Sequence, residues 1–269
     1  MKKFDFTNKT VIITGANSGI GKCLAQILIT KFNAKIIAVA RNEEKLNAVK
    51  QELGDNYLPY PFSVDSFENW QNFANTLINQ GVTVDALINC AGVLPTFNKF
   101  ENVTVNDYLS VININFLSTV YSTKIFLPIL KSNGDGVIIN VSSSSALCPF
   151  AGVSSYSASK VALERFSTCL AVEEKVVSIT TVMPGFTKTN VMRSQSQTEK
   201  ERGIIDKISA NPYKVANKII KKASKRKRRV ITGIDAHFMN FLYKFFPNSA
   251  PKILTWFLKK SNFSTFKDI

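Results

Sequence analysis

The sequence predicts an α/β fold, a doubly wound parallel sheet of about seven strands in a single domain. Its short apolar runs lack polar alternation, which is typical of strands covered on both faces. Longer amphipathic stretches, typical of crossover helices, separate these runs. No proline- or glycine-rich linker divides the 269 residues, and a 45% hydrophobic content is ordinary for a protein with a sizeable core.

The expected elements alternate along the chain. The strands are TVIIT (10–14), KIIAVA (35–40), LPYPFSV (58–64), VDALIN (84–89), GVIINV (136–141), VSITTVM (177–183) and RVITG (229–233). Between them we expect helices at 19–32 and 43–53, one ending near Gln80, a long one from about Thr104 to Lys131, and one after Val153. Strands separated by helices in this way are joined by parallel crossovers.

The net charge of +15 raises the question of an anionic partner, and seven of the basic residues lie in KKASKRKRR (221–229). One interpretation is a nuclear or nucleic-acid-binding patch. The other is a helix, PYKVANKIIKKAS, whose last turn and following loop carry cations that suit the negative end of the helix dipole. No basic helix with base-reading side chains accompanies the run, so we expect no nucleic-acid partner.

The spacing of the cysteines and the hydropathy of the sequence indicate the cellular compartment of the protein. The four cysteines form no Cys-x-x-Cys pair, so neither a zinc cluster nor a disulfide framework is indicated. The first apolar run breaks at Thr14 and Gly15, short of a signal-peptide core. No window reaches the roughly 18 uncharged apolar residues of a spanning helix. We therefore expect a cytoplasmic protein without a metal site.

A glycine-rich turn, TGANSGIG (14–21), connects the first expected strand to the first expected helix. Glycines at 15, 19 and 21 let the backbone turn sharply and approach a pyrophosphate, whose charge the helix N-terminus stabilises. The turn predicts a Rossmann-type dinucleotide site. Its expected cofactor-binding residues are Gly15, Asn17, Ser18, Gly19, Ile20 and Gly21.

The end of the second expected strand indicates which dinucleotide binds. An acidic residue there usually holds the free ribose 2′-hydroxyl of NAD(H), but this chain has Ala40 followed by Arg41. The guanidinium of Arg41 can form charge-assisted bonds to a 2′-phosphate. The sequence therefore favours NADP(H) over NAD(H), unless Arg41 is only a solvated residue at the start of a helix.

Seven motifs follow one another in a familiar order. They are TGANSGIG, VDS (64–66), NCAG (89–92), the asparagine of NINF (113–116), the serine run from 142, YSASK (156–160) and PGFTKT (184–189). In these motifs the sequence resembles the short-chain dehydrogenase/reductase family from about Lys9 to Gly233. The resemblance implies catalysis by Asn115, Ser143, Tyr156 and Lys160.

Tyr156 and Lys160 are four residues apart in a helical stretch, so their side chains share one face. A lysine cation nearby favours the phenolate and lowers the pKa of the tyrosine. Tyr156 could then exchange a proton with a substrate oxygen, as a general acid in reduction or a general base in oxidation. An exposed pair on an ordinary helix is the competing interpretation.

The serine stretch SSSSALCPFAGVSSYSASK holds eight serines. The family pattern implies a catalytic hydroxyl thirteen residues before Tyr156, which is Ser143; Ala146 stands where the family often has glycine. Ser142 alternates to the other face at the strand end, and Ser144 and Ser145 fall in the loop beyond. Ser143 would hold the substrate oxygen and stabilise the charge that develops there.

The resemblance implies roles at further positions. Asn115, rather than Asn113, would bend its helix locally and hold a water that links Lys160 to solvent. Asp65 would bond the adenine amino group. Its carboxylate could instead, or as well, be stabilised by the positive end of the dipole of the helix that follows it. Asn89 would anchor the strand ends. The remaining expected cofactor contacts are Ala91, Gly92, Tyr156, Lys160, Pro184 and Gly185. Thr189 and the backbone of Phe186 would orient the nicotinamide carboxamide.

The segments expected around the substrate are apolar and lack a cluster of charge. They supply Val93, Leu94, Phe97, Leu147, Phe150, Val153, Phe186, Val191 and Met192. An apolar ketone or secondary alcohol, steroid-like or a 3-oxo-lipid, is the expected substrate. The polar residues 193–210 suit either a lid that closes over substrate or a solvated surface helix.

Beyond a catalytic domain at 1–234, residues 235–269 form an amphipathic extension rich in phenylalanine, leucine and lysine. Two short helices joined at Pro247 to Pro251 would suit an anionic membrane surface, through residues 235–260, or equally a dimer interface or a lid. The helices from Thr104 to Lys131 and from Tyr156 to Ala171 resemble those through which the family forms dimers and tetramers.

The leading functional hypothesis is an NADP(H)-dependent oxidoreductase. A non-catalytic, dinucleotide-sensing binding protein is the alternative, and it does not explain the joint presence of the four implied catalytic residues. A nucleic-acid or membrane scaffold would explain the charge but not the motifs. A serine hydrolase lacks a base, because His237 is the only histidine and lies beyond the last expected strand.

Overall fold

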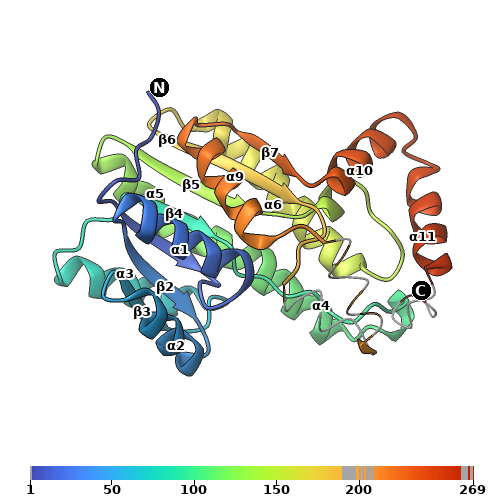
Figure 1. Ribbon diagram of the computed structural model, residues 1–269, viewed down its shortest axis with the longest axis horizontal. Helices are drawn as coiled ribbons and strands as arrows, with labels where there is room; N and C mark the ends of the chain where they lie inside the picture. Colours follow the sequence, from blue (N-terminus) through green and yellow to red (C-terminus); the bar gives the residue numbers. More distant parts are fainter. Residues whose placement is uncertain are drawn as a thin grey trace.

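The computed structural model describes residues 2–189, 198, 199, 201, 203, 207, 209–261, 266 and 269. Seven strands form one sheet in the order β3-β2-β1-β4-β5-β6-β7, and every neighbouring pair is parallel. The strands are β1 (Thr10–Thr14), β2 (Lys35–Ala40), β3 (Tyr57–Pro61), β4 (Ala86–Asn89), β5 (Gly136–Val141), β6 (Val177–Pro184) and β7 (Arg229–Thr232). The predicted fold class is confirmed (Figure 1).

Helices cover both faces of this sheet. They are α1 (Gly19–Phe32), α2 (Glu43–Leu53), α3 (Phe67–Asn79), α4 (Val105–Ile112), α5 (Ser118–Ser132), α6 (Ser154–Glu173), α9 (Pro212–Ser224), α10 (Ile234–Phe245) and α11 (Ala250–Lys260). Val11 and Ile13 pack in one apolar cluster with α1, α2 and α9, while Ile12 packs in another with α3, α5 and α6. Burial on both sides explains why the strands are apolar without alternation.

Strand β3 forms one edge of the sheet and contains two prolines. The carbonyl of Asn56 accepts from the N–H of Ile36, and the N–H of Phe62 donates to Ala40, so these even-numbered residues face β2. By alternation, Pro59 and Pro61 occupy positions whose nitrogen faces the free edge. Proline is tolerated there because no ladder hydrogen bond is lost.

The long helix expected from Thr104 to Lys131 is divided into three parts. Between α4 and α5 lies a π-helical segment, η2 (Asn113–Leu117), which contains the buried Asn115. The segment widens one turn, a feature that often occurs at functional sites. Hydropathy could not predict it, because the apolar period continues through the widened turn. Two short 3₁₀ segments, η1 (Phe100–Asn102) and η3 (Ser144–Ala146), complete the elements described.

The extension beyond Gly233 folds into α10 and α11, at the side of the molecule away from α2 and α3 (Figure 1). Ala236 packs against Leu147 and Met183, and Met239 and Ala250 pack against Cys148. Both helices are therefore attached to the rest of the fold by small buried clusters. Within the described residues, no helix combines the length and the apolar composition needed to cross a membrane.

Candidate active site

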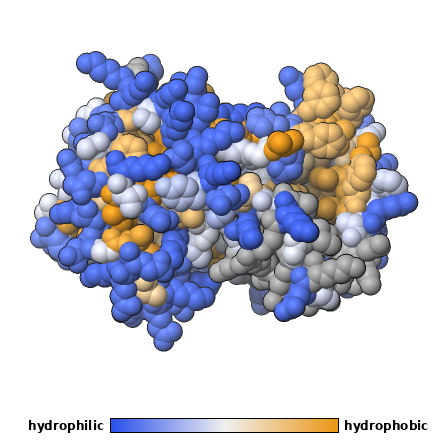
Figure 2. Space-filling view, in the orientation of Figure 1, coloured by the Kyte–Doolittle hydropathy of each residue, from blue (hydrophilic) through white to orange (hydrophobic). Residues whose placement is uncertain are grey.

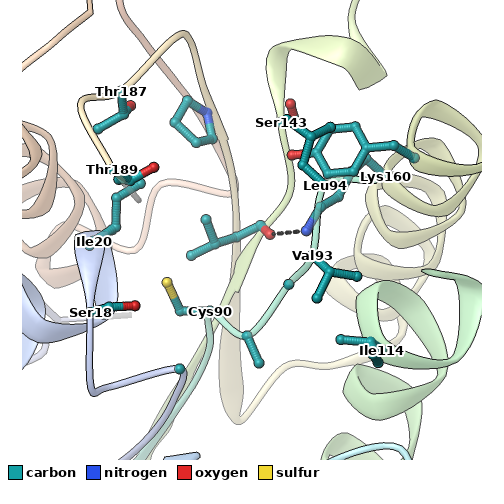
Figure 3. Close-up of a pocket in the computed structure, with 18 of the residues that line it drawn as sticks. Ser18, Ile20, Cys90, Val93, Leu94, Ile114, Ser143, Lys160, Thr187 and Thr189 are labelled. Carbon is teal, nitrogen blue, oxygen red and sulfur yellow. Dashed lines mark hydrogen bonds between the residues drawn. The ribbon is translucent and has the colours of Figure 1, made fainter. Parts of the chain in front are cut away.

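The carboxyl ends of the central strands border a cavity of about 400 Å³. Figure 3 shows Ser18, Ile20 and Thr189 on one side of it, and Ser143 and Lys160 on the other. Most residues expected to bind cofactor or to react line this cavity: Gly15, Asn17, Ser18, Gly19, Ile20, Gly21, Arg41, Ala91, Gly92, Ser143, Tyr156, Lys160, Pro184, Gly185, Phe186 and Thr189. Asp65, Asn89 and Asn115 are not among the lining residues.

The glycine turn between β1 and α1 fits a pyrophosphate. Gly15 and Gly19 have positive φ angles of 67° and 52°, which L side chains rarely adopt. A side chain at Gly21 would collide with the carbonyl oxygen of Gly15, because α1 starts directly against the turn. The first turn of α1 has no acidic residue, so its positive dipole end is available to an anion.

Thr14, at the end of β1, was missed in the sequence interpretation. Its hydroxyl oxygen accepts hydrogen bonds from the N–H groups of Cys90 (2.9 Å) and Ala91 (3.0 Å). These bonds fix the loop after β4 beside the glycine turn. A buried polar side chain that ends an apolar strand was the available signal.

Asn89 lies behind the cavity in a buried polar network. Its side-chain amide donates to Asn140 on β5 at 2.9 Å, and its carbonyl oxygen accepts from Ser122 on α5 at 2.8 Å. Asn140 in turn donates to Ser167 on α6 at 2.9 Å. The ends of β4 and β5 are thereby tied to each other and to two helices.

Asn115 connects the π-helical segment to the loop after β4. Its side chain accepts from the N–H of Val93 at 2.8 Å and donates to the carbonyl of Val93 at 2.9 Å and to Ser159 at 3.1 Å. A Cβ atom at Gly92 would lie 3.1 Å from Asn115 Oδ1 and 3.3 Å from Lys160 Nζ. Asn115 and the amino group of Lys160 therefore lie against the same side of Gly92.

Lys160 is buried on α6, and its amino group donates to the carbonyl of Val141 at 3.1 Å (Figure 3). The same nitrogen lies 5.8 Å from the centre of the Tyr156 ring. Burial disfavours the ammonium form and lowers the pKa of Lys160 to about 8. The amino group can therefore gain or lose a proton near physiological pH.

The pKa of Tyr156 is raised above its usual value, because burial disfavours the phenolate; a hydrogen bond from Ser143 acts in the opposite direction. The sequence interpretation expected Lys160 to lower this pKa. That direction was wrong for this structure, since removal of the phenol from water outweighs the hydrogen bond from Ser143. Burial therefore favours the protonated form of the Tyr156 phenol.

The adjacent serines at the end of β5 have different partners. Ser143 caps η3, where its hydroxyl oxygen accepts from the N–H of Ser145 at 3.1 Å, and it lines the cavity beside Tyr156. The hydroxyl of Ser142 is buried and donates to the backbone carbonyl of Lys160 at 2.8 Å. Only Ser143 combines access to the cavity with a hydrogen bond to the tyrosine.

Residues 9–200 match the family described as short chain dehydrogenase. The chain belongs to the short-chain dehydrogenase/reductase family. As a member of this family it is an oxidoreductase that uses a nicotinamide dinucleotide. The cavity fits that role, because Ser18 and Ile20 of the glycine turn lie on one side of it and Ser143 and Lys160 on the other (Figure 3).

Relatives of this short-chain dehydrogenase include a 3-ketodihydrosphingosine reductase from Bos taurus, 32% identical over 246 residues, or 86% of this chain and 73% of the relative. An 11-beta-hydroxysteroid dehydrogenase-like 2 protein from Arabidopsis thaliana is 37% identical over 195 residues, which cover 70% of this chain and 62% of the relative. The crystal structure of a short-chain dehydrogenase from Streptomyces avermitilis has a TM-score of 0.77 at 25% identity, covering 95% of this chain and 97% of that one.

Two cations of this dehydrogenase border the cavity near the end of β2, where the sequence predicts the ribose of the adenosine half. Arg41 follows β2, and Lys45 lies in the first turn of α2; both are exposed at the cavity. Asn42 caps α2 by accepting from the N–H of Lys45 at 2.7 Å. The sequence interpretation named Arg41 but missed Lys45, which a spacing of four residues could have indicated.

Asp65, expected at the adenine, is exposed and accepts a 2.5 Å hydrogen bond from the hydroxyl of Ser63. The cavity is lined instead by its neighbours Phe62, Ser63 and Val64. The carboxylate is thus engaged within its own loop in this structure, and its adenine role stays a prediction.

The loop after β6 is held by a residue of the C-terminal extension. The backbone N–H of Phe186 donates to the carboxylate of Asp235 at 2.6 Å, and the carbonyl of Phe186 accepts from the N–H of Ala210 at 2.8 Å. A side chain at Gly185 would collide with Asp235. Because both backbone groups of Phe186 have partners here, a nicotinamide carboxamide would have to share or replace them.

The substrate side of the cavity is apolar. Of the residues expected there, Val93, Leu94, Phe97, Phe150 and Phe186 line it. Leu147 does not, because it packs against Met183 and Ala236, and Val153 is buried behind Phe97. Val191 and Met192, and most of the expected lid at 193–210, lie outside the described residues.

Proposed function

We propose that the protein is an NADP(H)-dependent oxidoreductase that transfers hydride between the nicotinamide and a hydrophobic ketone or secondary alcohol, either steroid-like or a 3-oxo-lipid. The observation that carries the substrate class is an apolar cluster that includes Tyr156 itself. Its other members are Leu94, Phe97, Phe150, Val153, Leu258, Phe266 and Ile269. Among its members only the tyrosine hydroxyl is a polar side-chain group, which suits a substrate with one oxygen in an apolar body.

The proposed proton transfer uses groups already in contact. In the direction of reduction, a nicotinamide dinucleotide bound in the cavity would supply the hydride, and residues of this chain would supply the proton. Tyr156 donates its phenolic proton to the carbonyl oxygen, so that the alcohol forms and a phenolate remains. Ser143 holds the same oxygen, and the protonated Lys160 beside the ring stabilises the phenolate. Asn115, next to Lys160, would take part in returning the proton from solvent.

The preference for NADP(H) is supported by charge. Arg41 and Lys45 both border the cavity at the end of β2, and Ala40 leaves no carboxylate on that strand end. A 2′-phosphate there could bind both cations, and the planar guanidinium of Arg41 could form two hydrogen bonds to it. NAD(H) would leave both cations without that partner.

The names of the relatives support the same substrate class. The Bos taurus relative is named for a ketodihydrosphingosine and the Arabidopsis thaliana relative for a hydroxysteroid. Both names describe a large apolar molecule with an oxygen function that is reduced or oxidised. The uncharged, aromatic substrate side of this cavity agrees with such a molecule.

The assembly that we propose is supported by the composition of the surface. Val105, Leu109 and Val161 are exposed on α4 and α6, which favours a homodimer or homotetramer formed through these helices and α5. We propose a cytoplasmic protein whose catalytic domain spans 1–234, with the extension at 235–269 packed beside it. Peripheral contact with a membrane through residues 235–260 is developed below.

The function can be tested by measuring NADPH oxidation with a panel of 3-oxo-lipids and steroid ketones, alongside short polar ketones. We expect turnover with the apolar ketones, little with the polar ones, and slower turnover with NADH. Tight binding of NADPH without turnover of any carbonyl would favour the dinucleotide-sensing alternative. Preferred turnover of charged substrates would contradict the proposed substrate class.

A further inference from the structure

Nine large apolar side chains are exposed on α10, α11 and the segment between them. They are Ile234, Phe238, Phe241, Tyr243, Phe245, Phe246, Ile253, Trp256 and Phe257, with exposed fractions from 37% to 90%. We refer to this set as the α10–α11 face. Figure 2 shows apolar surface gathered at the upper right, where Figure 1 draws these two helices. A concentration of exposed aromatic residues of this kind marks an interaction site.

The exposed charges on this segment are predominantly positive. Lys244, Lys252, Lys259 and Lys260 are all exposed between residues 234 and 261, where Asp235 is the only acidic residue in the sequence. The Asp235 carboxylate faces inward to the N–H of Phe186, so it does not offset the lysines at the face. The segment therefore presents aromatic surface together with uncompensated positive charge.

The lysines lie close to the aromatic rings. Lys260 Nζ is 4.9 Å from the centre of the Trp256 ring, and Lys244 Nζ is 5.5 Å from that of Phe245. Aromatic rings and lysines that occur together on a short amphipathic helix are suited to the headgroup layer of a bilayer, with the rings at the acyl boundary and the ammonium groups at lipid phosphates.

A second copy of the chain would fit this face less well. A two-fold contact joins the same patch on both subunits. It would bring the lysines of one α10–α11 face near those of the other, with no carboxylate on the face to separate them. An anionic lipid surface has the opposite charge and can accommodate all four lysines.

We propose that the α10–α11 face docks the protein on an anionic lipid bilayer, with the aromatic side chains inserted in the headgroup region. The face is also connected to the substrate side of the cavity. Thr255 on α11 accepts a 3.1 Å hydrogen bond from the N–H of Ala151, and Leu258 packs in the cluster that includes Phe97 and Tyr156. Resting on the proposed function, the docked enzyme takes its apolar substrate from the bilayer beside this cluster.

Vesicle flotation with the full chain tests the docking. We expect at least about tenfold more protein to float with phosphatidylcholine vesicles that contain phosphatidylserine than with phosphatidylcholine alone, and the difference to shrink at high salt. The double variant Phe241→Ser/Trp256→Ser should lose most of this binding. Ile78→Ser, at a similarly exposed position on α3, is the matched control and should float like the wild type.

Two charge-reversal variants separate the electrostatic contribution to vesicle binding from the apolar contribution. Lys252→Glu/Lys259→Glu should lose the preference for anionic vesicles, whereas Lys50→Glu/Lys218→Glu, which changes charge equally on α2 and α9, should keep it. The proposal is overturned if wild-type protein stays unbound with both vesicle types, or if the Phe241→Ser/Trp256→Ser variant floats equally well. A loss of dimer in that variant, without any flotation of the wild type, would assign the face to self-association instead.

Activity measurements keep the docking distinct from the proposed function, since flotation needs no turnover. The Phe241→Ser/Trp256→Ser variant should turn over a water-soluble apolar ketone like the wild type. Turnover of a ketone carried in anionic vesicles should fall several-fold in the same variant. Flotation without any ketone turnover would remove the proposed function and leave the docking intact, whereas equal turnover of the vesicle-borne ketone would contradict substrate delivery.

Discussion

The hydroxyl of Ser142 donates a 2.8 Å hydrogen bond to the backbone carbonyl of Lys160, while the neighbouring Ser143 faces the cavity. Two adjacent serines thus have separate tasks at the end of β5. The first is bonded to the helix that carries the proposed proton donor, and the second lines the cavity, where we propose that it holds the substrate oxygen. This division predicts different outcomes when each hydroxyl is removed.

Ser143→Ala should reduce turnover by roughly 100-fold or more, because a hydrogen-bond donor to the developing charge is lost. Ser142→Ala should keep most activity but lower the free energy of unfolding by about 1 kcal/mol, the usual cost of one buried hydrogen bond. Steady-state kinetics and urea unfolding measure the two effects. Ser144→Ala is the control and should change neither strongly; a greater loss of turnover in Ser142→Ala than in Ser143→Ala would reverse our assignment.

Tyr156→Phe should reduce turnover by about 10²- to 10⁴-fold, since the variant has no phenolic proton to donate. Binding of NADPH, followed by fluorescence titration, should change only a few-fold because the ring remains. Undiminished turnover would exclude the acid/base role. A parallel loss of NADPH affinity would instead indicate that the hydroxyl mainly holds the cofactor.

Arg41→Ala should raise the KM for NADPH by about tenfold or more, the expected effect of losing charge-assisted bonds to a phosphate. The KM for NADH should stay nearly unchanged. Lys45→Ala should act in the same direction but less strongly, because an ammonium lacks the bidentate fork. Equal losses with both cofactors would show that the two cations do not read the 2′-phosphate.

Lys160→Met should abolish turnover and yet stabilise the protein at pH 7. Burial lowers the pKa of Lys160 from 10.5 to about 8, so below pH 8 the folded state holds a buried cation at a cost of about 3 kcal/mol. Between these pKa values the folded protein loses its proton first, so wild-type stability rises with pH. The advantage of Lys160→Met in urea unfolding should therefore shrink by pH 10; a variant less stable than wild type at pH 7 would refute this.

Asp235→Ala should loosen the loop that begins at Gly185, because the N–H of Phe186 loses its carboxylate acceptor. We expect the KM for the cofactor to rise several-fold with a smaller change in kcat. Asp235→Asn retains an acceptor oxygen and should restore most of the affinity. If Asn and Ala behave alike, the contact contributes through charge rather than through the position of the loop.

The strands could be predicted because a strand that is buried on both faces has a continuous apolar run in its own sequence. GVIINV was expected at 136–141 and β5 has those bounds. By contrast, β3 starts one residue earlier and ends three residues earlier than expected at 58–64. Its limits depend on pairing with β2, which lies far away in the sequence and leaves no local pattern.

The candidate site also has some features that the local sequence predicts and others that only the structure shows. Tyr156 and Lys160 are close in sequence, so helical spacing alone was enough to expect them on one face. The contact between Asp235 and Phe186 joins residues 49 positions apart, and the bond between Ser142 and Lys160 depends on how α6 approaches β5. The direction of the Tyr156 pKa also required the structure, because burial of the phenol decides it.

The prolines of β3 have a consequence for how the protein behaves in concentrated solution. A free sheet edge normally presents N–H groups that can recruit a strand from another molecule and begin aggregation. At Pro59 and Pro61 those donors are missing, and no side chain need be charged to achieve this. Replacement of both by valine would restore a continuous row of donors and should make the protein prone to edge-to-edge association, even if its fold and activity were unchanged.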